Sequence, residues 1–161
     1  MRVIKKRRRR QRKTDYKHRL NLLKGGNVRV VIRKTNKYLI IQEIESKEAQ
    51  DRVITSVSSK DLLKEGLNKK FSGSLKSIPA CYLTGLLMAK KMKNKEINVV
   101  DLGMYRNHYG GRLYSAIKGL LDGGIKIKVD PKVFPKEERL EGKHLKEEVR
   151  KEFEKIKNKL L

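Results

Sequence analysis

A dense run of positive charge near the start limits what this chain can fold into. Nine of the twelve residues from Arg2 to Lys13 are Lys or Arg, and none is acidic. Adjacent cations repel one another and bury no apolar surface, so this run cannot contribute to a hydrophobic core. We predict that residues 1–13 form an arm that stays disordered until an anionic partner neutralises it. The core must then come from the residues beyond.

The positive charge extends past this arm. The 161 residues hold 42 Lys and Arg against 18 Asp and Glu, a net charge of +24. The first twenty residues carry eleven cations and one acid, a net +10, and the remainder carries 31 cations and 17 acids, a net +14. Because the body is basic in its own right, an extended polyanion such as RNA or DNA is favoured over a simple import signal.

Other classes of protein are disfavoured by the composition. Cys81 is the only cysteine, which excludes an internal disulfide framework and a multi-cysteine zinc site. No stretch approaches the roughly 18 apolar residues that span a bilayer, and the arm lacks the bulky apolar face of a membrane-binding helix. No secretory signal follows the basic start. We expect a soluble cytoplasmic protein with no cofactor, no metal and no membrane partner.

Hydrophobic periodicity and glycine pairs divide the rest of the chain into short elements. Strands are predicted over Val28–Ile32, Tyr38–Ile44, Asp51–Ser59 and Ile97–Leu102, the last covered on both faces. Helices are predicted from Thr14 to Gly25-Gly26, from Ser77 to Met92, from Gly110 to Gly123-Gly124, and along the final apolar stripe of Leu145, Val149, Phe153, Ile156 and Leu160.

This order predicts an α/β fold. Three antiparallel strands followed by a helix, a strand and a helix favour a mixed sheet packed against helices over residues 14–130. Residues 131–161 are expected to form an extended segment and a C-terminal helix. Thr14 is the expected N-cap of the first helix, which would dock through the stripe of Tyr16, Leu20 and Leu23.

Positive side chains also gather on the predicted hairpin. Side chains alternate along a strand, so Arg29 and Arg33 share one face, opposite Val30 and Ile32. The hairpin would present a basic rib to irregular RNA, with tyrosine rings available for stacking. The alternative is an edge hairpin kept soluble by its charge, with Tyr16 as a packing residue. The candidate RNA-binding residues here are Tyr16, Arg29, Arg33, Lys34, Asn36, Lys37 and Tyr38.

The loop MYRNHYGG, residues 104–111, offers a second candidate site. Amides and the positive end of a helix dipole meet at Gly110-Gly111-Arg112, which suggests a phosphate site. The glycines fit neither a P-loop nor a dinucleotide fingerprint, so nucleotide binding of that kind is not expected. His108 is a candidate catalytic base without a serine or cysteine partner, and we favour a surface or RNA-facing histidine.

A nuclease is the enzyme alternative, because ribonuclease-H-like nucleases share this order of elements. Their chemistry needs several carboxylates that converge on two metal ions. The first predicted strand contains no acid, and the fourth offers only Asp101. We therefore expect no enzymatic activity.

Several stretches together resemble a known family. The motifs are KTDYKHRLNLL, RVVIRKTNKYLIIQ, YLTGLLMAKK, VVDLGMYRNHYGGRLYSAIKGLLDGG and FPKEERLEGKHL. They are similar to the archaeal and eukaryotic form of large-ribosomal-subunit protein eighteen over about residues 5 to 150. The chain departs from the family pattern at Leu67, where a tryptophan is usual, and at Ser77-Ile78-Pro79, where Asn-Thr-Pro is expected.

The resemblance implies a ribonuclease-H-like fold without nuclease activity. It also implies a structural protein of the large ribosomal subunit that binds 5S rRNA in the central protuberance and contacts large-subunit rRNA and neighbouring ribosomal proteins. The loop from Arg106 to Arg112, which includes His108, matches the family without indicating which RNA it faces. The other positions that match are Lys5, Lys6, Arg7, Arg8, Arg9, Arg10, Arg12, Lys13, Tyr16, Arg19, Arg33, Lys34, Asn36 and Lys37. A small-subunit-type ribosomal protein or a general RNA chaperone is the rival interpretation.

Overall fold

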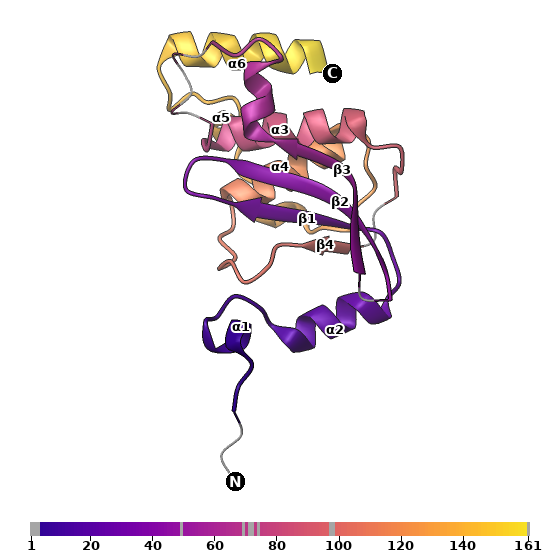
Figure 1. Cartoon of the computed structure of the whole chain (residues 1–161). Helices are drawn as coiled ribbons and strands as arrows, with labels where there is room; N and C mark the ends of the chain where they lie inside the picture. Colours follow the sequence, from indigo (N-terminus) through magenta and orange to yellow (C-terminus); the bar gives the residue numbers. More distant parts are fainter. Residues whose placement is uncertain are drawn as a thin grey trace.

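A four-stranded sheet lies at the centre of the computed structural model, which describes residues 4–160 apart from 49, 69, 71, 72, 74, 97 and 98 (Figure 1). The strands are β1 (Arg29–Lys34), β2 (Leu39–Lys47), β3 (Gln50–Ser58) and β4 (Val99–Asp101). The helices are α1 (Arg7–Arg10), α2 (Tyr16–Lys24), α3 (Ile78–Lys91), α4 (Arg112–Asp122), α5 (Glu137–Leu140) and α6 (Glu147–Leu160). Two 3₁₀ turns are η1 (Ser59–Leu63) and η3 (Pro131–Val133).

The sheet is mixed, with the strand order β3-β2-β1-β4. β1, β2 and β3 form an antiparallel meander, and β4 pairs in parallel with β1, so that Asp101 lies opposite Val31. A parallel neighbour requires a crossover, which the chain makes through α3. The predicted α/β fold, a three-stranded meander followed by a helix, a strand and a helix, is confirmed.

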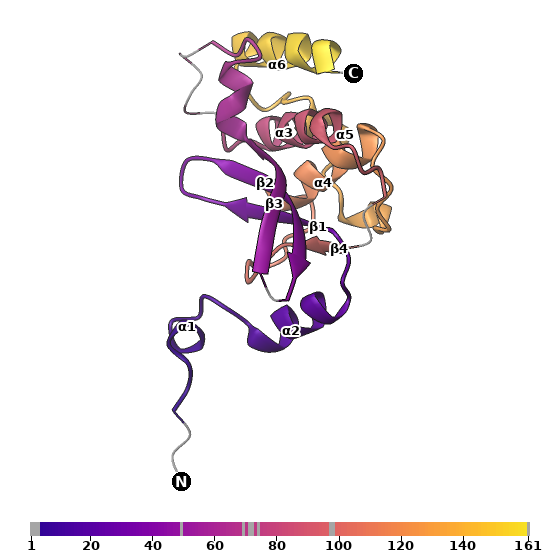
Figure 2. The ribbon, with the colours of Figure 1, turned by 45° about the vertical axis from the view of Figure 1, so that its right-hand side comes forward.

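The core lies between the sheet and the helices on one of its faces. Val30 and Ile32 of β1 are fully buried there. α3 is buried from Pro79 to Ala89 because the sheet, α4 and α6 surround it (Figure 2). α6 packs on α3 through four residues of the predicted stripe, Val149, Phe153, Ile156 and Leu160. The arm and α2 lie on the other side of the sheet (Figure 1).

Helices α3 and α4 approach closely because glycines face each other. A Cβ at Gly85 would lie 2.2 Å from the carbonyl oxygen of Ala116, and one at Gly119 would lie 2.1 Å from the carbonyl oxygen of Tyr82. Side chains do not tolerate such distances, so the two backbones are in direct contact. This contact supports α4, which begins at Arg112, the last residue of the Arg106–Arg112 loop.

Some local expectations were wrong. The N-cap of α2 is Asp15 and not Thr14, since the Asp15 carboxylate accepts hydrogen bonds from the amides of Lys17 and His18 at 3.0 and 3.2 Å. Leu20 is 52 % exposed, whereas Tyr16 and Leu23 are half-buried, so the predicted apolar stripe docks only in part.

β4 and the arm also differ from expectation. Val99 and Val100 are only half-buried, and β4 is an edge strand with a neighbour on one side, so its described residues are less covered than expected. Residues 97 and 98 of that predicted strand lie outside the described residues. The arm, predicted to lack structure, contains one exposed helical turn, α1.

The glycine contact predicts a specific loss of stability. Gly85→Ala should lower the free energy of unfolding by about 2 kcal/mol or more, because the added methyl overpacks the α3–α4 interface. Urea unfolding followed by circular dichroism measures this change.

Gly73→Ala is the matched control, since a Cβ at Gly73 would meet no atom of the described residues within 4 Å. It should change stability by less than about 0.5 kcal/mol. Equal unfolding midpoints for the two variants would show that the helices do not meet at Gly85.

Candidate nucleic-acid interface

Two carboxylates on the outer strands lie beside α2, and one of them, Asp51, forms an ion pair with it. The Arg19 guanidinium lies 3.3 Å from Asp51 of β3, and the imidazole of His18 lies 3.9 Å from Asp101 of β4. The Asp15 cap fixes where α2 begins and therefore where these two side chains point. α2 has no fully buried residue, and Tyr16, Leu22 and Leu23 are half-buried, so polar contacts and a partly covered apolar side together position it.

Asp51 of β3 also forms an ion pair with Arg29 of β1. The Arg29 Nη2 atom donates to Asp51 Oδ1 at 2.9 Å, and Ser46 donates to the same oxygen. Burial alone would raise the pKa of Asp51, but these hydrogen bonds and the charges of Arg29 and Arg19 together hold the pKa below its usual value. The Arg29 side chain is only 6 % exposed. Its Nη1 and Nη2 atoms donate to Ser46 and Asp51, and its buried Nε atom has no hydrogen-bond partner among the described residues.

Asp101, the one carboxylate that the first and fourth predicted strands offered to the nuclease alternative, is bound to Arg33. Arg33 Nη2 donates to Asp101 Oδ2 at 2.6 Å, and the Gly103 amide donates to Oδ1 at 2.7 Å. Burial would raise the pKa of Asp101, but the hydrogen bonds from Arg33 and Gly103 outweigh it, and the pKa is lowered. Both carboxylate oxygens are therefore occupied by protein donors.

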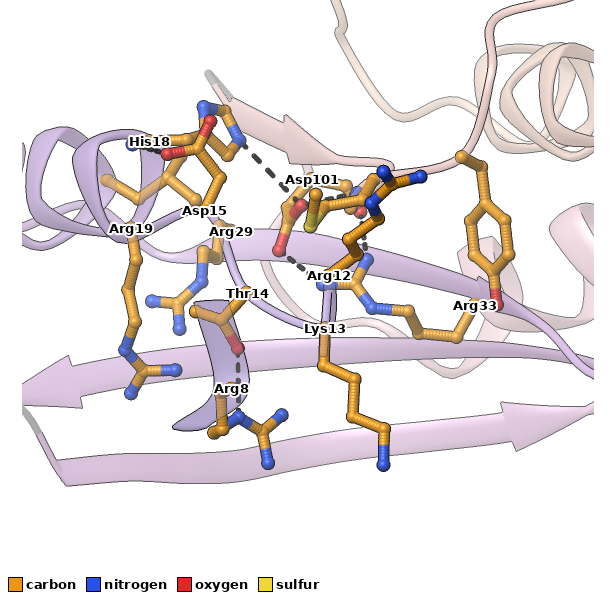
Figure 3. A pocket seen from close by; sticks show the side chains of 14 residues that line it. Arg8, Arg12, Lys13, Thr14, Asp15, His18, Arg19, Arg29, Arg33 and Asp101 are labelled. Carbon is orange, nitrogen blue, oxygen red and sulfur yellow. Dashed lines mark hydrogen bonds and ion pairs between the residues drawn. The ribbon is translucent and has the colours of Figure 1, made fainter. Parts of the chain in front are cut away.

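A groove lies between the arm, α2 and the sheet. Figure 3 shows the side chains that line this arm groove, which has a volume of about 760 Å³. Asp51 is not among its lining residues, but Asp15 and Asp101 are, and both already accept protein hydrogen bonds. Its cationic lining residues are Arg8, Arg12, Lys13, Arg19, Arg29 and Arg33.

The arm itself is exposed and positively charged. Its contacts with the body are polar: Arg8 Nε donates to Thr14 Oγ1 at 2.9 Å, and the Lys6 ammonium lies 4.7 Å from the centre of the Tyr16 ring. No arm cation forms an ion pair with a carboxylate among the residues that the structure describes. The candidate cations Lys5, Lys6, Arg7, Arg8, Arg9, Arg10, Arg12 and Lys13 are all exposed.

The hairpin turn projects two further candidates. Asn36 and Lys37 are exposed, and the turn closes through a hydrogen bond from the Thr35 amide to the Tyr38 carbonyl at 2.8 Å. Tyr38 is half-buried against the core, which limits the ring surface available for stacking. Lys34 lies 5.4 Å from the centre of the Tyr105 ring.

The remaining sequence candidates lie elsewhere. Arg106, His108 and Arg112 line a second cavity beside the start of α4, and not the arm groove. Sequence reasoning missed Asp15 and Asp51, which position α2 and Arg29. The Asp15 signal was present, because Asp is as good an N-cap as Thr. The pairing of Asp51 with Arg29 depends on the fold, because the two residues are 22 positions apart, and no local sequence pattern indicates it.

Other functional chemistry finds little support. Among the described residues, no three His, Cys, Asp or Glu side chains are placed to hold a metal ion. Burial raises the pKa of the Cys81 thiol to about 12, so this thiol is inert at neutral pH. Within the part of the chain that the structure describes, no helix is long and apolar enough to cross a membrane.

The sequence of this chain is similar to those of known ribosomal proteins. A family model described as "Ribosomal large subunit proteins 60S L5, and 50S L18" matches residues 2–98. The large ribosomal subunit protein uL18 of Korarchaeum cryptofilum is 44 % identical over 144 residues, 88 % of this chain and 72 % of that protein. The uL18 protein of Methanothrix thermoacetophila is 38 % identical over 161 residues, 96 % of this chain and 93 % of that protein. That of Methanoregula boonei is 37 % identical over 141 residues, 86 % and 79 % of the two chains.

The Arg33–Asp101 pair predicts a pH-dependent contribution to stability. A carboxyl group whose pKa is lowered by folding stabilises the protein fully above its unfolded-state value, near 3.8, and loses that contribution as the pH falls through the lower folded-state pKa. Asp101→Asn should therefore cost about 1–3 kcal/mol at pH 7, and this difference from the wild type should shrink steadily below pH 4.

Denaturant unfolding at pH 7 and at pH 3 measures both effects. Glu138→Gln is the control, because the Glu138 side chain is exposed and forms no ion pair among the described residues. A difference between Asp101→Asn and wild type that stayed constant with pH would contradict the assignment.

Proposed function

This chain belongs to the family of large-ribosomal-subunit proteins that includes 60S L5 and 50S L18, and we propose that it is a structural constituent of the large subunit that binds 5S rRNA. Membership of this family confirms the resemblance seen in the sequence. The relatives are named as ribosomal proteins and not as enzymes, which agrees with the occupied carboxylate of Asp101. In the proposed role the protein helps to anchor 5S rRNA in the central protuberance.

The observation that carries this proposal is that the positive charge of the arm is not neutralised by carboxylates among the described residues, and that the arm lies beside the arm groove. The arm cations have no carboxylate partners among the described residues, and the groove is held open by α2 and by paired carboxylates beneath it. Binding of RNA by such cations is driven by the release of condensed counterions. The arm would follow phosphates, and the folded body would fix the register of the RNA.

The candidate residues divide into two groups by this mechanism. Arg29 and Arg33 are engaged by Asp51 and Asp101, so they support the floor of the groove. Tyr16, already covered by the Lys6 ammonium, supports the arm. The proposed contacts to 5S rRNA are Lys5, Lys6, Arg7, Arg8, Arg9, Arg10, Arg12, Lys13, Arg19, Lys34, Asn36 and Lys37.

Further partners follow from the same assignment. Large-subunit rRNA and neighbouring ribosomal proteins would contact the surfaces that 5S rRNA leaves free. The protein would then be found on ribosomes in the cytoplasm.

A general RNA chaperone is the rival function. A chaperone should bind unrelated structured RNA as well as it binds 5S rRNA, because exposed cations alone carry no preference. Competition between labelled 5S rRNA and unlabelled transfer RNA separates the two. A clear preference for 5S rRNA supports the proposal, and equal competition favours the chaperone.

The arm assignment predicts a change in the salt dependence of 5S rRNA binding. Replacing Arg7, Arg8, Arg9 and Arg10 with Ala should weaken binding and reduce the log–log salt slope by about 3 if all four contact phosphates, since each phosphate contact contributes roughly 0.7 to 0.9. Filter binding of labelled 5S rRNA between low and moderate salt gives the slope.

A control with the same loss of charge replaces Lys136, Lys146, Lys151 and Lys155 with Ala, all of which are exposed and far along the chain from the arm. Its slope should change much less. If both quadruple variants lowered the slope equally, total charge and not the arm would determine binding.

A further inference from the structure

The cavity beside the start of α4 is separate from the arm groove. This distal pocket has a volume of about 500 Å³ and is lined by segments from β1, the β4–α4 loop, the start of α3 and the C-terminal extension. Arg33 lines the arm groove, whereas Lys34, the next residue of β1, lines the distal pocket. Consecutive side chains on a strand point to opposite faces, so the two sites lie on opposite sides of the sheet.

Positive charge in the distal pocket is not neutralised. Its lining includes no Asp or Glu, and the ionisable residues are Lys34, Arg106, His108, Arg112, Arg139 and His144. None of these forms an ion pair among the residues that the structure describes. The arm groove, by contrast, contains Asp15 and Asp101. Lys34, Arg106, Arg112 and Arg139 thus share one cavity whose lining has no carboxylate, and a bound anion would be attracted to them.

Hydrogen bonds and packing contacts fix the segments that line the distal pocket. The Gly110 amide donates to the Val133 carbonyl at 2.9 Å, which ties the β4–α4 loop to the segment after α4. Ser115 Oγ donates to the Ile78 carbonyl at 2.7 Å, which ties α4 to α3. Gly142 packs against Pro79 at the start of α3, and this contact places Arg139 and His144 at the pocket.

The lining also offers an apolar surface. Leu113 is 7 % exposed, and Ile78 and Leu145 are half-buried at the same cavity. Cations beside an apolar floor match a nucleotide, whose phosphate is anionic and whose base is flat and largely apolar. Tyr109, adjacent to His108, is 75 % exposed and could stack on a following base.

We propose that the distal pocket binds one unstacked nucleotide of an RNA strand, with its phosphate among Arg106, Arg112 and Arg139 and its base against Leu113 and Leu145. Side chains, and not a glycine-rich fingerprint, would make the contacts. In taking RNA as the ligand this inference rests on the proposed function, and it adds a second RNA site on the opposite side of the sheet from the arm.

The three histidines of the chain make a direct test possible. His108 and His144 line the distal pocket and His18 lines the arm groove, so their NMR resonances report on the two sites separately. The full-length protein is titrated at constant pH with AMP, with ribose 5-phosphate and with a four-nucleotide oligoadenylate. AMP should shift His108 and His144 at a concentration about tenfold lower than ribose 5-phosphate does, because only AMP carries a base. The oligoadenylate should act at least as well as AMP.

A double variant tests the cations. Arg112→Ala with Arg139→Ala should raise the AMP concentration needed for half-saturation by about tenfold or more, because charge-assisted hydrogen bonds are lost. Lys151→Ala with Lys155→Ala removes the same charge from the exposed face of α6 and should change that concentration by less than about twofold. All four side chains are exposed, and circular dichroism checks that the variants are folded.

Three results would overturn the inference. The first is a common shift of all three histidines at one AMP concentration, and the second is an equal response to AMP and ribose 5-phosphate. The third is binding of AMP without binding of the oligoadenylate, which would indicate a site for free nucleotides. Binding of 5S rRNA and of unrelated RNA is measured on the same proteins. Equal binding of the two RNAs would refute the proposed function, whereas the histidine titration would still decide whether the distal pocket binds a nucleotide.

Discussion

Carboxylates are too few for the cations in this chain, and their positions decide which cations remain free. Asp51 and Asp101, on the two outer strands, neutralise Arg29 and Arg33 on one face of the sheet and also reach α2. The arm has no such partner among the described residues. Carboxylates within the fold thus neutralise Arg29 and Arg33 on the sheet, and the cations of the arm remain available to an anionic ligand. This division explains how so basic a chain can have a compact core.

The sheet also separates the positive charge in space. Its helix-covered face supplies the core, and the opposite face supports α2 and the arm (Figure 2). β1 runs between the two, with Arg33 on the arm side and Lys34 at the distal pocket. Glycine contacts hold the middle of α4 against α3, and Ser115 ties the first turn of α4 to the Ile78 carbonyl, so packing inside the core fixes the position of cations at the surface.

Sequence reasoning found the elements whose signals are local. The hairpin of β1 and β2, the Ser77 cap of α3 and the glycine that ends α4 are each visible within a few residues, and the structure confirms them. It failed where distant residues decide the outcome. The burial of Arg29 depends on Asp51, 22 positions away and on another strand, and β4 is an edge strand only because of the sheet order. Arg139 and His144 were missed at the distal pocket because they come from the C-terminal extension.

Central to this account is the claim that RNA, and not the protein body, neutralises and orders the arm. Hydrogen exchange of the backbone amides of residues 4–13, with and without 5S rRNA, tests it most directly. We predict rapid exchange in the free protein, because these residues are exposed and held by few polar contacts, and strong protection in the complex, while the amides of β1 and α3 remain protected throughout. Exchange in residues 4–13 that is equally slow without RNA, or equally fast with it, would contradict the account.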